Sequence, residues 1–73
     1  MALPPSAGLT AVLEVLATAT ANVSVGQVCG GRISAVWLGD SLELVAVTLE
    51  PHELTDAAIC RAKALAFVAE LPS

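Results

Sequence analysis

Apolar residues recur at intervals of three or four positions in several parts of the chain, which is the spacing of one side of an α-helix. The first run predicts a helix that is capped by Ser6 or Thr10 and ends near Ala21 and Asn22. The apolar side of this helix consists of Leu9, Val12, Leu13 and Leu16. This run is the clearest helical pattern in the sequence.

A second helix is predicted between Asp40, which can cap its N-terminus, and Pro51, which lacks the N–H that a helix interior needs. Glu43 lies three positions after Asp40, as a capping box requires. The apolar side of this helix consists of Leu42, Val45 and Leu49.

The last third of the chain predicts two further helices. Thr55 and Asp56 can cap a short one that carries Ala58 and Ile59. The final helix stops at Pro72, and its apolar residues are Leu65, Val68 and Leu71. Arg61 and Lys63 lie between the two helices, and the sequence leaves open whether the helices are separate or nearly continuous.

Residues 22–39 are rich in glycine and serine, and Gly30 and Gly31 together are a strong break in regular structure. They predict a long loop that covers one end of the core. The chain is then one domain, residues 1–73, of the all-α class: a small four-helix bundle with a long loop between helices one and two. The predicted core consists of Leu13, Leu16, Leu42, Val45, Leu49, Ile59, Leu65 and Val68.

The same residues also alternate with the period of β-strands, which leaves a second fold open. Alternation runs through residues 33–37 and 42–49, and Gly39–Asp40 can form a hairpin turn between them. With Val23 and Val25 as a further strand, the order becomes helix, three strands, helix, which resembles the small YbaB-type nucleoid-associated proteins that dimerise. Such a sheet would have apolar residues on both faces and would need extensive cover, so the all-α fold is favoured.

Composition narrows the function. Of the 73 residues, 56% are hydrophobic and 14% are charged, which indicates a well-buried core or a surface for a partner. The net charge is −4 with three basic residues, so nucleic acid is an unsuitable partner. Residues 40–56 contain acidic but no Lys or Arg residues, and such a segment attracts basic patches on other proteins.

Few residues in the sequence indicate a catalytic site, a metal site or a membrane-spanning segment. Cys29 and Cys60 lack the spacing of a metal or disulfide motif, so we expect both thiols to be free and Cys60 to be buried. His52 is expected in an exposed loop, and Trp37 is expected to fill the core. No stretch is typical of a signal peptide or a membrane span, which predicts a soluble, cytoplasmic protein. A chain of 73 residues has no room for a deep active-site cleft, so we expect no enzyme activity.

Ser41 is the main candidate for a functional residue. A serine at the start of a helix lies beside free backbone N–H groups and the positive end of the helix dipole, which stabilise a phosphate on its hydroxyl. With Asp40 before it and Leu42 after it, Ser41 forms an Asp–Ser–Leu motif within "LGDSLEL".

This motif, the acidic segment and the final "LTDAAICRAKALAFVAEL" resemble acyl carrier proteins of the fatty acid or polyketide type over essentially the whole chain. "LTAVLEVLATA" is similar to the first helix of that family, and "ISAVWLGDSLELV" is similar to the approach to its second helix. The resemblance implies that Ser41, between Asp40 and Leu42, carries 4′-phosphopantetheine as a phosphodiester. The thiol of that arm would hold acyl intermediates as thioesters.

The resemblance also implies the partners of a monomeric carrier. A phosphopantetheinyl transferase would load Ser41, and ketosynthase-type and acyltransferase-type enzymes of fatty acid or polyketide biosynthesis would visit it. Glu43 best fits the role of contacting basic residues on these enzymes, with Glu50 and Glu53 as further candidates. The alternative is a dimeric α/β interaction module of the YbaB type, without a prosthetic group.

Overall fold

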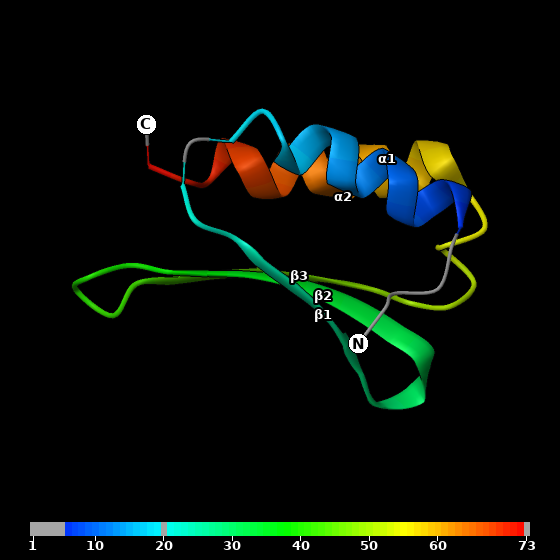
Figure 1. The fold of residues 1–73 in the computed structure, drawn as a ribbon, viewed down its shortest axis with the longest axis horizontal. Coiled ribbons are helices and arrows are strands. Elements are labelled where there is room, and N and C mark those ends of the chain that lie inside the picture. Colours follow the sequence, from blue (N-terminus) through cyan, green and yellow to red (C-terminus); the bar gives the residue numbers. More distant parts are fainter. Residues whose placement is uncertain (1–5, 20, 73) are drawn as a thin grey trace.

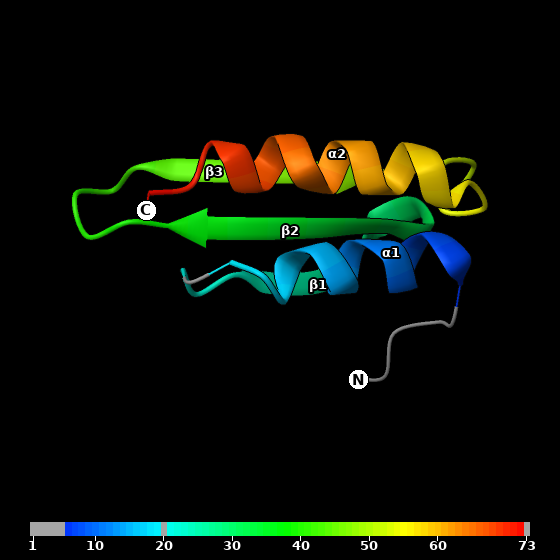
Figure 2. The ribbon, with the colours of Figure 1, turned by 90° about the horizontal axis from the view of Figure 1, so that it is seen from above.

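The computed structural model describes residues 6–19 and 21–72, which fold into one layer of helices on one layer of sheet (Figure 1). The regular elements are, in chain order, helix α1 (Ala7–Leu16), strands β1 (Ser24–Val28), β2 (Arg32–Leu38) and β3 (Leu44–Leu49), and helix α2 (Ala57–Ala69). Both helices lie on the same face of the sheet and run in the same direction (Figure 2). The prediction of an all-α four-helix bundle is therefore wrong, and the fold has the element order of the alternative.

The three strands form an antiparallel sheet in the order β1-β2-β3. A short turn, Cys29–Gly31, connects β1 to β2, so the expectation of one long loop over residues 22–39 is wrong. Gly30 and Gly31 have φ angles of 81° and 75°, a left-handed conformation that is strained for residues with a Cβ atom. The glycine pair thus closes a hairpin and does not break up a loop.

The segment predicted as the second helix forms β3 and the turn that precedes it. Helical spacing of Leu42, Val45 and Leu49 is present, but so is alternation, and the β-branched residues of this segment favour extended backbone. Pairing with β2 decides between the two patterns, since every residue of β3 has a partner on β2. Pro51 follows the strand and starts the next turn.

The predicted first helix is confirmed in its start but not in its end. The Ser6 hydroxyl oxygen accepts a hydrogen bond from the Leu9 N–H at 3.0 Å, and α1 ends at Leu16, before the predicted Ala21. The two predicted C-terminal helices are one continuous helix, α2, because no glycine or proline interrupts it. Asp56 caps α2 as predicted and accepts hydrogen bonds from two backbone N–H groups of its first turn.

The core lies between the helices and the sheet. Its largest fully buried side chains are Phe67, Ile33, Leu49, Val12 and Cys60. Of the predicted core, Leu49 is buried, whereas the exposed members are Leu13, Leu42, Ile59 and Leu65 and the half-buried members are Leu16, Val45 and Val68. The difference arises because α1 turns the side with Val12 and Val15 toward the sheet. The start of α1 packs closely on the turn between β3 and α2, where a Cβ atom on Gly8 would lie 2.5 Å from the Leu54 carbonyl oxygen.

Candidate protein-interaction surface

The face of the sheet opposite the helices has no second layer over it among the described residues (Figure 1). Ile33 and Ala35 are buried beneath the helices, and side chains alternate along a strand, so their neighbours and the residues paired with those neighbours point the other way. We call this side the outer face. Its side chains are Ser24, Val28, Arg32, Ser34, Val36, Leu38, Leu44, Ala46 and Thr48, and Gly26 is the position on it without a side chain.

Away from Arg32, the outer face carries no charged side chain, and its hairpin end is apolar. Leu38 is 61% exposed, Leu44 is 65% exposed and Val28 is 45% exposed. At one end, the charges of Arg32 and Glu50 neutralise each other, with 3.0 Å between the Arg32 Nε and a carboxylate oxygen. Contiguous apolar patches of this kind mark surfaces that bind other proteins or apolar ligands.

The outer face is not flat, because it has a hollow at one end and two protruding leucines at the other. A Cβ atom placed on Gly26 would meet nothing within 4 Å, so this position is a gap in the layer of side chains. A shallow hollow of about 250 Å³ lies there, bordered on the outer face by Ser24, Val28, Ser34 and Val36. Leu38 and Leu44 stand at the opposite, hairpin end of the same face.

Ser41 lies in the turn of the β2–β3 hairpin, so the predicted helix N-terminus at this residue is wrong. The Gly39 N–H donates to the Glu43 carbonyl oxygen at 2.8 Å, and the Leu42 N–H donates to the Gly39 carbonyl oxygen at 3.0 Å. These hydrogen bonds define a three-residue loop, residues 40–42. Its last residue, Leu42, has a left-handed φ angle of 66°, which is typical of such loops. Asp40 is a turn residue here and does not cap a helix.

This turn removes the electrostatic argument for a phosphate on Ser41. Ser41, Asp40 and Leu42 are all exposed, but no aligned helical N–H groups point at the serine hydroxyl. Trp37 is half-buried near the turn rather than in the core, and a Cβ atom on Gly39 would lie 2.6 Å from its ring. The hairpin tip is thus an exposed loop supported by an aromatic side chain.

The three carboxylates predicted to bind partners do not form one surface. Glu43 is exposed in the hairpin turn, whereas Glu50 pairs with Arg32. Glu53 accepts hydrogen bonds from the Lys63 ammonium at 2.8 Å and from the Glu50 N–H at 2.9 Å. The Lys63 ammonium, and then the Glu50 N–H, lower the pKa of Glu53. Two of the three carboxylates therefore hold the chain's own turns together.

The two cysteines and the histidine are the other residues whose side chains could take part in chemistry. Cys60 is buried as expected, and its thiol donates to the Glu53 carbonyl oxygen at 3.0 Å. Burial raises the pKa of Cys60, which keeps the thiol protonated and unreactive near neutral pH. Cys29 is free and exposed, and His52 is exposed in the turn after β3. Residues 6–19 and 21–72 contain no cluster of His, Cys, Asp and Glu that could hold a metal ion.

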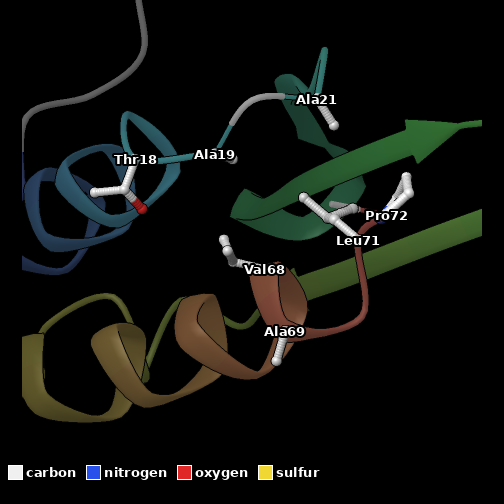
Figure 3. A pocket seen from close by; sticks show the side chains of 7 residues that line it. All are labelled: Thr18, Ala19, Ala21, Val68, Ala69, Leu71 and Pro72. Carbon is white, nitrogen blue, oxygen red and sulfur yellow. The ribbon is translucent and has the colours of Figure 1, made fainter.

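A second cavity, of about 300 Å³, lies between the C-terminal ends of the two helices (Figure 3). Its lining residues are Thr18, Ala19, Ala21, Val68, Ala69, Leu71 and Pro72. None of these side chains is ionisable, and the Thr18 hydroxyl donates to the Val15 carbonyl oxygen within its own turn. The cavity therefore lacks an acid, a base or a nucleophile for chemistry.

Sequence reasoning did not select the outer face, although the signal for it was present. A sheet with apolar residues on both faces needs cover on both, and the described helices cover one. None of the helices in residues 6–19 and 21–72 is long and apolar enough to cross a bilayer. Comparison of the chain with known protein families, with curated proteins and with solved structures finds no match.

Proposed function

We propose that this chain is a non-enzymatic protein-interaction module that works as a homodimer, in which the outer faces of two sheets pack against each other. The main observation behind the proposal is the exposed outer face, which is uncharged from Ser34 to its hairpin end. A sheet buries its apolar faces against neighbouring layers, and the two helices supply a layer on one side. A second copy supplies the layer that the other side lacks.

The size of the outer face supports a dimer of modest affinity. With about 3.3 Å per residue along a strand and about 4.8 Å between strands, a face of three strands and seven residues covers roughly 300 Å² in projection. Because side chains make the accessible surface larger than its projection, two copies bury at most about 1,000 Å², at the lower limit for a specific interface. We therefore expect a dissociation constant in the micromolar range.

The absence of enzyme activity is part of the same proposal. Neither the hollow at Gly26 nor the cavity between the helix ends is lined by an ionisable side chain, and the buried thiol of Cys60 has a raised pKa. Attachment of 4′-phosphopantetheine to Ser41 stays a prediction that rests on the resemblance. The physical argument for it required a helix that starts at Ser41, and the structure has a turn there. We do not include a carrier role in the proposed function.

Sedimentation equilibrium over a range of concentrations tests the dimer, since one chain has a mass of 7.4 kDa. We expect the mass to approach twice this value at high concentration. Leu44→Lys, which places a charge in the outer face, is expected to give a monomer at all concentrations. Leu65→Lys is a matched control, because Leu65 is a similarly exposed leucine, at 54%, on α2. A wild-type chain that stays monomeric, or equal weakening by both variants, would overturn the proposal.

A further inference from the structure

We infer that the two copies pack with Leu38 and Leu44 of each chain seated in the Gly26 hollow of the other, around a two-fold axis through Val36. This inference rests on the proposed dimer and specifies how it is built. The outer face carries a raised apolar end and an unfilled hollow, which are complementary in shape. In a second copy of this chain, the leucine end and the Gly26 hollow are the same distance apart as in the first. A second copy can therefore fill the hollow while its own hollow is filled.

The strand register places the axis. Val36 pairs with Ala46 on β3 and with Ser24 on β1. Leu44 lies one strand away from Val36 and one outward-facing position nearer the hairpin tip. Gly26 lies one strand away on the other side and one outward-facing position further from the tip. Val36 is therefore midway between the raised end and the hollow.

A two-fold axis in the plane of the interface through Val36 exchanges Leu44 of one copy with the position over Gly26 of the other. With an outward-facing step of about 6.6 Å and a strand spacing of about 4.8 Å, the strands of the two sheets then cross at roughly 70°. The same rotation places Leu38 over β1 of the other copy, between Ser24 and Gly26. A steep crossing of this kind belongs to the orthogonal class of sheet packing.

Electrostatics are compatible with this contact between two negatively charged chains. The side chains around Val36 are uncharged, while the Arg32–Glu50 pair lies at one end of the sheet and Asp40 and Glu43 lie in the turn at the other. Charges at the periphery of an interface remain in water and are screened by salt. Repulsion between the copies therefore stays weak where the apolar surfaces meet.

Gly26→Val tests the seating of the leucines. A Cβ atom at this position meets nothing within 4 Å in the monomer, and valine favours a strand more than glycine does, so the monomer should be as stable as wild type or more stable. The filled hollow should weaken dimerisation by at least about tenfold in sedimentation equilibrium. Gln27→Val is the matched control, because Gln27 is the next residue of β1 and points to the other face.

Crosslinking tests the axis independently. In a Cys29→Ser background, which removes the exposed native thiol, Val36→Cys should give a covalent dimer with a short bis-maleimide. A residue on a two-fold axis meets its own copy, whereas Val28→Cys, at the far end of β1 on the same face, lies well away from the axis and should crosslink far less.

The outcomes separate this inference from the proposed function. If Gly26→Val dimerises as tightly as Gln27→Val while Leu44→Lys is monomeric, the outer face is the interface and the seating of the leucines is wrong. If Val28→Cys crosslinks as well as Val36→Cys, the position of the axis is wrong. A wild-type chain that never dimerises overturns both proposals.

Discussion

Replacing Leu42 by glycine should stabilise the protein, although glycine usually destabilises regular structure. Leu42 has a φ angle of 66° and is 81% exposed, so its side chain contributes little packing. The left-handed conformation costs a residue with a Cβ atom about 1–2 kcal/mol, and glycine avoids this cost. The greater freedom of glycine in the unfolded chain offsets about 0.5–1 kcal/mol. The expected net gain is about 0.5–1 kcal/mol.

Urea unfolding in the Leu44→Lys background, where dimerisation is removed, measures this change in the free energy of unfolding. Ser41→Gly is the control, because Ser41 is exposed in the same turn and does not have a positive φ angle. We expect Ser41→Gly to destabilise by about 0.5 kcal/mol, opposite in sign to Leu42→Gly. In a helix that starts at Ser41, both substitutions would destabilise. Equal losses for the two variants would therefore refute the hairpin turn and the reasoning from it.

Two further predictions concern the acidic residues and Ser41. Because the pKa of Glu53 is lowered by Lys63, the Glu53 carboxylate stabilises the fold above the unfolded glutamate pKa of about 4.3, and this contribution is lost as the pH falls through the lower folded pKa. Chemical unfolding at a series of pH values measures this contribution. As the pH falls, the free energy of unfolding should decrease less for Glu53→Gln than for wild type, and equal decreases would contradict the role of Lys63. Incubation with coenzyme A and a phosphopantetheinyl transferase, read by intact mass beside a control carrier, should leave the mass unchanged, because the Ser41 hydroxyl lies in a hairpin turn. A mass gain that disappears in Ser41→Ala would instead establish the carrier role.

Features that depend on neighbouring residues could be predicted from the sequence. The cap at Ser6, the apolar period of α1, the cap at Asp56 and the end of the central element at Pro51 each depend on interactions within a few positions. The buried, free state of Cys60 also follows from its chemistry, since a lone thiol behaves as a small apolar side chain.

The tertiary structure decided what residues 42–49 become and where the interaction surface lies. This segment contains a helical spacing and a strand alternation at once, and no local signal separates them. Pairing with β2 supplies hydrogen bonds and buries Leu49, which an isolated segment cannot do. That choice moves Ser41 from a helix start to a turn and brings Val36, Leu38 and Leu44 onto one exposed face. Contacts between residues distant in the sequence therefore determine the candidate site, and local chemistry alone could not identify it.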